Sequence, residues 1–247
     1  MLLAFSLLQL TNGILIIFFL FLVFRFIETN WSYKISKPYQ WEEAVRSGVV
    51  SKKLKKIERF YRDKVRFYTF WLQINRLKKE SVVGALAEVG VYKGETARII
   101  HEIDNTRPLH LFDTFEGFNK QDLEIENSNH TNYSIDFSDT EIELVSKFIK
   151  GNDNILFHKG YFPVTAENLR QEIFAFVHLD ADLYKPTLAG LEFFYPRLSP
   201  GGVIIVHDYN HNWQGVTNAV DEFVKTIPEN LMEISDWQGS IMIIKNK

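Results

Sequence analysis

The sequence predicts an open α/β sheet of the Rossmann-like type, preceded by helices and by an apolar amino-terminal segment. Apolar runs of strand length alternate with amphipathic helical segments from residue 82 to residue 226. One of these runs passes through a glycine turn into a helix over 85–100, which is how open α/β sheets present a nucleotide. The last two apolar runs, 232–237 and 240–244, have no helix between them, so they predict a terminal antiparallel hairpin.

Composition limits the classes of function. The 247 residues suffice for one domain of catalytic size with a small appendage, and 46% hydrophobic residues can fill a core. A net charge of -3 gives no electrostatic reason to expect a nucleic-acid partner. The absence of cysteine excludes disulfides and thiolate metal sites.

Residues 1–24 contain no Lys, Arg, Asp or Glu, and 13–24 are almost purely apolar. At about 1.5 Å per residue, such a helix reaches roughly the 30 Å of a bilayer core. A cleaved signal peptide would begin with basic residues and end at a small-x-small site, and the sequence has neither. A buried amphipathic helix would need a polar face. We therefore expect 1–26 to be an uncleaved single-pass membrane anchor.

Basic residues follow the apolar segment and none precedes it, so the positive-inside rule places the folded domain in the cytoplasm. Residues 27–80 have apolar side chains at helical spacing between lysines and arginines, which predicts a helical linker or cap. The lysine run at 52–56 fits a solvated helix face or a contact with anionic lipid. Residues 81–247 form the predicted catalytic domain.

Within that domain the strands are expected at 82–88, 109–112, 155–158, 174–179 and 203–206. The intervening helices are expected at 93–104, 140–150, 187–198 and 215–226. The polar stretch 119–139 is predicted as a loop, and the fifth strand is expected to begin after a turn at 200–202.

Acidic residues or a glycine stand where the parallel strands end, and ligands bind at that edge of such sheets. These residues are Glu88, Asp113, Gly160, Asp180 and Asp208. Four carboxylates at one rim repel one another, so the sequence predicts a cationic group among them. The sulfonium of S-adenosylmethionine and a divalent metal are the two candidates.

The turn after the first strand has the spacing E-x-G-x-x-x-G. Glu88 and Gly90 are expected to border the amino-acid end of the cofactor, with Gly90 allowing close approach of the backbone. Gly94 is expected to ease packing of the helix on the strand, and we include it in the cofactor-binding turn. This spacing differs from the dinucleotide fingerprint, so by itself it indicates only a turn.

The second and third strand ends complete the predicted cofactor site. Asp113 suits hydrogen bonds to ribose hydroxyls, with capping of its own turn as the alternative. Gly160 and Tyr161 follow the third strand, where Tyr161 offers an aromatic face to adenine or packs in the core.

The fourth and fifth strand ends predict the chemical step. Oxygens of Asp180 and Asp208, with a nitrogen of His207, would form an open site for Mg²⁺ or Mn²⁺. Asp182 could then take a proton from a substrate hydroxyl as general base. The structural alternatives are a helix cap for Asp182 and a hydrogen-bonded buried side chain for His207.

Several motifs in order carry a resemblance to a known family: Glu88-Val-Gly-Val-Tyr-Lys-Gly94, Asp113-Thr-Phe-Glu-Gly117, Lys159-Gly-Tyr-Phe162, Leu179-Asp-Ala-Asp-Leu-Tyr184, Tyr195-Pro-Arg-Leu-Ser-Pro-Gly-Gly202, His207-Asp-Tyr209 and Ala219-Val-Asp-Glu-Phe223. From residue 82 onward the chain resembles the macrocin O-methyltransferase family. The terminal hairpin is likewise similar to class I S-adenosylmethionine-dependent methyltransferases.

This resemblance implies magnesium-dependent methylation of a sugar hydroxyl. It places Asp180 and Asp208 at the positions of metal ligands and Asp182 at the position of the general base. His207 departs from the family, which usually has Asp there. A neutral imidazole removes one negative charge and favours softer ions, so the departure bears on the identity and affinity of the metal. The membrane segment lies outside the resemblance.

The sequence as a whole therefore predicts a metal-dependent O-methyltransferase at the inner face of a membrane. Its acceptor would be a small-molecule or lipid-linked sugar. The sequence is also compatible with a homo-oligomer. A membrane-anchored glycosyltransferase using a nucleotide sugar is the main alternative, because Asp180-Ala181-Asp182 could also hold Mn²⁺ and a sugar diphosphate. That alternative leaves Glu88, Gly90 and Asp113 unexplained. A third hypothesis is a catalytically inactive binding module on the same scaffold.

Overall fold

The computed structural model describes residues 7–128, 137–210 and 212–247. The chain divides into two compact units, Met1–Val50 and Ser51–Lys247. This boundary falls inside the predicted linker or cap at 27–80, because the later helices of that segment belong to the unit that contains the sheet. The first six residues of the predicted anchor lie outside the described residues.

The first unit contains the helices α1 (Leu7–Ser36) and α2 (Tyr39–Arg46). Within α1, residues Leu7–Thr29 are long and apolar enough to cross a bilayer, and none of that stretch is buried in the structure. Length and composition are the only basis for this assignment, and a signal sequence meets the same criteria.

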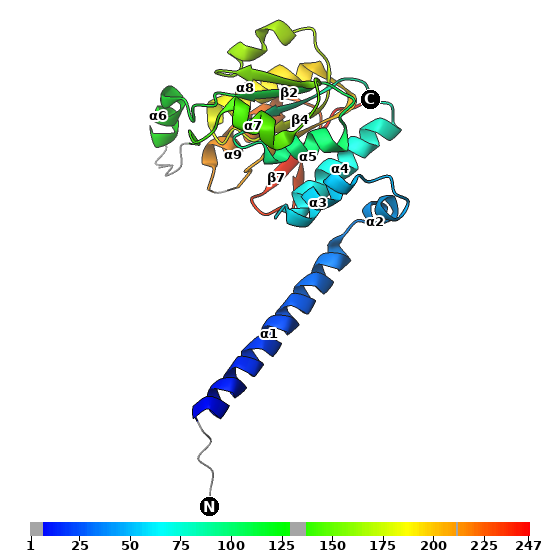
Figure 1. Ribbon diagram of the computed structural model, residues 1–247. Helices are drawn as coiled ribbons and strands as arrows, with labels where there is room; N and C mark the ends of the chain where they lie inside the picture. The colour runs from blue at the N-terminus through cyan, green and yellow to red at the C-terminus, as the bar shows by residue number, and fades with distance from the viewer. Residues whose placement is uncertain (1–6, 129–136, 211) are drawn as a thin grey trace, which may run out of the picture. The chain divides into compact units, whose positions relative to one another are not determined.

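The second unit is built on one seven-stranded sheet of order β3-β2-β1-β4-β5-β7-β6 (Figure 1). The strands are β1 (Ala85–Val89), β2 (Leu109–Asp113), β3 (Ile155–Lys159), β4 (Phe174–Leu179), β5 (Leu198–His207), β6 (Met232–Ile234) and β7 (Ser240–Ile244). Strands β1 to β5 are parallel, and β7 pairs antiparallel with both β5 and β6. The predicted Rossmann-like sheet with a terminal hairpin is confirmed.

The helices of this unit are α3 (Lys52–Phe60), α4 (Lys64–Lys79), α5 (Glu95–Ile103), α6 (Lys120–Ser128), α7 (Ile142–Ile149), α8 (Tyr184–Arg197) and α9 (Gln214–Phe223), with short 3-10 turns at Val164–Leu169 and Val224–Thr226. Helices α3, α4 and α7 pack with α5, while α8 packs with α9. Side chains capping the first turns explain two helix starts: Ser51 accepts a hydrogen bond from Leu54 N, and Asp63 accepts one from Arg66 N.

The two helical layers cover opposite faces of the sheet, and β4 contributes an aromatic ring to each. Phe174 packs edge-on against Phe194 of α8, with ring centroids 4.9 Å apart. Phe176 packs edge-on against Phe70 of α4 at 5.5 Å. Residues two apart normally share a face, but the register of β4 shifts between Phe174 and Phe176. This irregularity allows one strand to fill both halves of the core.

Two predicted boundaries differ from the structure. The predicted loop at 119–139 contains helix α6, while residues 129–136 lie outside the described residues. Strand β5 begins at Leu198 and runs through the predicted turn, and Gly201 takes φ 79 within it. The Pro-Gly-Gly sequence therefore marks an irregularity inside a strand, where β5 also shifts register against β4.

Candidate active site

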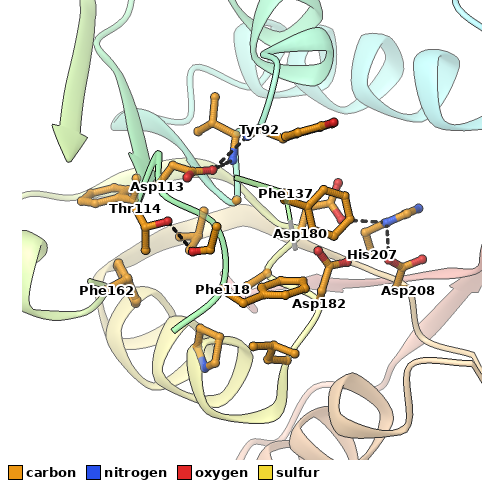
Figure 2. A pocket seen from close by; sticks show the side chains of 18 of the residues that line it. Tyr92, Asp113, Thr114, Phe118, Phe137, Phe162, Asp180, Asp182, His207 and Asp208 are labelled. Carbon is orange, nitrogen blue, oxygen red and sulfur yellow. Dashed lines mark hydrogen bonds and ion pairs between the residues drawn. The ribbon is translucent and has the colours of Figure 1, made fainter. Parts of the chain in front are cut away.

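A cavity of about 580 Å³ opens at the carboxyl ends of the parallel strands. Its lining comes from the segments that follow β1, β2, β3, β4 and β5, and from helix α4 and the turn that precedes it. Among the sequence-predicted residues it contains Gly90, Asp113, Gly160, Tyr161, Asp180, Asp182, His207 and Asp208. Figure 2 shows Asp113 beside Tyr92 on one side and the carboxylates of Asp180, Asp182 and Asp208 grouped with His207 on the other.

The turn after β1 depends on a glycine. Gly90 lines the cavity at φ 84, a backbone region that favours glycine. A Cβ on Gly90 would lie 1.9 Å from the carbonyl oxygen of Asp180. The glycine is therefore required because the turn after β1 crosses the end of β4, which brings the two halves of the site together.

Asp113, at the end of β2, holds the same turn in place. Its Oδ2 accepts hydrogen bonds from the backbone N–H groups of Val91 at 2.7 Å and Tyr92 at 2.9 Å. Its Oδ1 accepts one from Phe115 N at 2.6 Å. The alternative of a turn cap is thus present in the structure, together with a position on the cavity wall.

Two residues predicted for the cofactor turn lie outside the cavity lining. Glu88 is fully buried, and its Oε1 lies 2.7 Å from His178 Nδ1 on the sheet face that α4 covers. Burial raises the pKa of Glu88, and the bond to His178 offsets part of that rise. A Cβ on Gly94 would lie 2.8 Å from Val145 Cγ1, so Gly94 serves the packing of α5 against α7. Glu88 lies in the core behind the cavity wall: its partner His178 has Nε2 3.9 Å from Oδ2 of Asp180, which lines the cavity.

Tyr161 lies on the cavity wall, and helix α6 holds its hydroxyl. The Tyr161 hydroxyl donates to Asp122 Oδ1 at 3.2 Å, and burial together with this carboxylate raises the pKa of Tyr161 to about 12. Glu126, one turn further along α6, accepts a hydrogen bond from Tyr184 N at 2.6 Å, at the start of α8. Helix α6 thus closes one side of the cavity through buried polar contacts.

The ends of β4 and β5 bring two carboxylates and an imidazole together. His207 Nδ1 lies 2.8 Å from Asp180 Oδ1 and 3.2 Å from Asp208 Oδ2. Burial opposes the charged imidazolium, but these two carboxylates raise the pKa of His207 to about 9. Burial likewise opposes ionisation of Asp180, yet His207, His178 and Arg66 keep the pKa of that carboxyl below its usual value.

Asp182 lies next to this cluster and faces the cavity (Figure 2). Burial and the nearby charges of Asp180 and Asp208 raise the pKa of Asp182 well above that of an ordinary aspartate. Its backbone takes φ 61, as does that of Asp208. Strained backbone of this kind concentrates at functional sites. The residue that caps α8 is Leu183, so Asp182 does not take the capping role that was its structural alternative.

Part of the cation expected among the carboxylates is supplied by the chain itself. Arg66 of α4 is buried, and its Nη1 lies 3.8 Å from Asp180 Oδ2. Its Nε lies 3.6 Å from Asp236. Sequence reasoning missed Arg66, since it looked like one of several solvated basic residues in an amphipathic helix.

Tyr61 precedes α4 and also lines the cavity. Phe118 and Phe137 were missed as well; their rings are 5.2 Å apart and both line the cavity (Figure 2).

The donor set of Asp180, His207 and Asp208 fits a divalent metal. One ligand atom from each residue can be chosen so that all lie within 4.8 Å of one another. Within the described residues, His207 Nε2 and Asp208 Oδ1 are buried and have no hydrogen-bond partner. Unpartnered buried polar atoms are costly, and a metal ion would satisfy them. Two carboxylates with one imidazole suit Mn²⁺ and Mg²⁺.

Comparisons with known proteins identify a family and a fold for this chain. The model of a family described as macrocin-O-methyltransferase (TylF) matches residues 63–244. One relative, from Streptomyces olivaceus, is an 8-demethyl-8-(2,3-dimethoxy-alpha-L-rhamnosyl)-tetracenomycin-C 4'-O-methyltransferase, 28% identical over 142 residues. Another, from Micromonospora griseorubida, is a mycinamicin III 3''-O-methyltransferase, 31% identical over 146 residues.

These two alignments cover 53% of this chain and 54% and 57% of the relatives, so the chain spans little more than half the length of each. The solved structure of the O-methyltransferase NovP superposes with a TM-score of 0.60 at 22% identity. That superposition covers 74% of this chain and 81% of NovP, and it shows the shared fold.

Proposed function

Because this chain belongs to the macrocin O-methyltransferase family, we propose that it transfers the methyl group of S-adenosylmethionine to a hydroxyl of a sugar or glycan precursor. Both relatives are named as O-methyltransferases, and one name specifies a rhamnosyl group. The observation that carries the proposal is the single cavity that joins the glycine turn and Asp113 to the cluster of Asp180, Asp182, His207 and Asp208.

In this proposal the cofactor occupies the part of the cavity formed by the ends of β1, β2 and β3. Gly90 leaves room for the amino-acid end, and Asp113 faces the ribose from a position fixed by three backbone N–H groups. Tyr161 offers a ring whose orientation Asp122 fixes. The carboxylates at the rim favour the sulfonium cation by charge.

The acceptor hydroxyl would lie at the ends of β4 and β5. When bound, S-adenosylmethionine supplies an electrophilic methyl group, and a divalent metal supplies a Lewis acid that lowers the pKa of a hydroxyl. Asp180, His207 and Asp208 would hold that metal. Asp182 takes the hydroxyl proton while the acceptor oxygen bonds to the methyl carbon and the carbon–sulfur bond breaks. His207, His178 and Arg66 together keep the pKa of Asp180 below its usual value, and Arg66 Nη1 lies 3.8 Å from Asp180 Oδ2.

Titration of the full-length chain in detergent with S-adenosylmethionine, with and without EDTA, tests this assignment. We expect micromolar binding of S-adenosylmethionine that survives chelation, because the cofactor side of the cavity contains none of the three predicted metal ligands. We expect methyl transfer, by contrast, to disappear with EDTA and to return with Mn²⁺ or Mg²⁺.

The same titration separates the alternatives. Binding of a nucleotide sugar only, and only with metal, would favour the glycosyltransferase. Binding of S-adenosylmethionine with full activity in EDTA would contradict the metal site and leave the methyltransferase assignment intact.

For location, we propose that α1 is a single-pass anchor and that the sheet unit faces the cytoplasm. The support is the apolar stretch Leu7–Thr29 and the basic residues that follow it. We expect the chain to sediment with membranes and to resist extraction by high salt and carbonate. Deletion of residues before 31 should release it. A shortened mature amino terminus would instead identify a cleaved signal sequence.

A further inference from the structure

A second cavity lies beside the first on the sheet unit. Its volume is about 500 Å³, and its walls come from α3, α4 and the turn between them, from α5 and α7, and from the turn between β6 and β7. Four residues line both cavities: Tyr61, Arg66, Glu95 and Gln238. A ligand that occupies both would therefore pass these side chains.

The two cavities carry opposite charge. The cations that line the second cavity are Lys56, Arg62, Arg66 and Arg98, and its carboxylates are Asp63 and Glu95. The first cavity has three basic residues, Arg66, Lys93 and His207, against six acidic ones: Glu95, Asp113, Asp122, Asp180, Asp182 and Asp208. The first cavity thus favours cations, and the second favours anions.

Three cations of the second cavity are not neutralised by the chain. Among the described residues, Lys56 and Arg62 are exposed and form no ion pair or hydrogen bond. Arg98 lies over the ring of Phe148, 4.9 Å from its centroid, and its buried Nε has no hydrogen-bond partner within the described parts of the chain. Arg66 differs, since three carboxylates surround it. Lys56, Arg62 and Arg98 are therefore available to an anionic ligand.

Aromatic rings border the same cavity and are open to solvent. The side chains of Phe60 and Trp237 are 70% and 74% exposed. Exposed rings beside unpaired cations suit a ligand that joins an anionic group to a flat or apolar one. Arg and Lys are also the residues that bind phosphate oxygens, Arg through two parallel N–H bonds.

We propose that the second cavity binds the diphosphate of the acceptor, so that the substrate is a sugar diphosphate whose sugar extends past Tyr61 and Gln238 into the first cavity. This inference rests on the proposed function and specifies its substrate class. The group beyond the diphosphate is either a nucleoside or a prenyl chain, and the rings of Phe60 and Trp237 can contact both.

The test compares two double variants of the full-length chain in detergent. Lys56→Gln with Arg62→Gln removes two cations from the cavity. Lys52→Gln with Lys79→Gln removes two exposed cations outside the cavity, one from α3 and one from α4, and serves as the matched control. The probes are uridine diphosphate glucose, prenyl diphosphate glucose, inorganic pyrophosphate and free glucose, each titrated by calorimetry. S-adenosylmethionine is titrated in parallel to verify the fold of each variant.

We expect the wild-type chain to bind pyrophosphate and at least one of the two glucose diphosphates. The cavity variant should bind them about 10-fold or more weakly, while the control stays within about twofold of wild type. The glucose diphosphate that binds identifies the group beyond the phosphates. Binding of S-adenosylmethionine should be equal in all three proteins.

Failure of the wild-type chain to bind any diphosphate would overturn the inference, as would equal loss of binding in the cavity variant and the control. If S-adenosylmethionine still binds in those cases, the substrate class is wrong and the methyltransferase proposal stands. If S-adenosylmethionine itself does not bind, the proposed function fails first.

Discussion

Replacing Asp182 by Asn is expected to lower the rate of methyl transfer by about 100- to 10,000-fold, while the Kd for S-adenosylmethionine stays within about twofold. The amide keeps the size of the side chain but cannot accept a proton. Asn also tolerates the left-handed backbone at φ 61, so the local fold should persist. The rate is measured as production of S-adenosylhomocysteine with an acceptor on which the wild type is active.

Asp153→Asn is the matched control, because it makes the same chemical change at an exposed position outside the cavity. Its rate should equal that of the wild type. If Asp182→Asn transferred methyl groups at the wild-type rate, another group would have to be the base. If the wild type shows no detectable turnover and Asp182→Asn changes only its stability, the inactive binding module would be favoured.

Replacing Gly90 by Ala is expected to produce the largest loss of stability. The new Cβ would meet the carbonyl oxygen of Asp180 at 1.9 Å, in a backbone conformation that costs about 1 to 2 kcal/mol for an L-residue. Relief of the clash must move the end of β4, which adds roughly 1 to 3 kcal/mol. For a domain of this size we expect the Tm to fall by roughly 5 to 15 °C. At temperatures where the variant is still folded, its rate of methyl transfer should also fall, because Asp180 moves.

Gly201→Ala separates the clash from the backbone strain. Gly201 has φ 79, close to that of Gly90, but the nearest side-chain atoms to its new Cβ are 3.4 Å away. It belongs to the same sheet, so both variants report on the same unfolding transition. Thermal unfolding should show a much smaller change for Gly201→Ala. Equal destabilisation of the two variants would mean that the contact with Asp180 is not tight.

The sequence alone determined the sheet, its terminal hairpin and most of the strand-end residues. The apolar run 174–179 and its neighbours must be buried strands because they are short, apolar and bounded by polar turns. In a parallel sheet the carboxyl ends share one edge, so Asp113, Asp180 and Asp208 converge whatever the details of packing.

Only the tertiary structure decided which of these side chains face the cavity and which other residues join them. Glu88 is fully buried and pairs with His178 of the neighbouring strand at 2.7 Å, a contact between distant segments that the sequence does not show. Helix α6 is held by Asp122 and Glu126 against distant residues rather than by an apolar stripe of its own. Arg66 resembles any basic residue of an amphipathic helix until the packing of α4 on the sheet brings it to Asp180. Sequence patterns report local periodicity, whereas the partners of a buried charge are set by contacts between segments far apart in the chain.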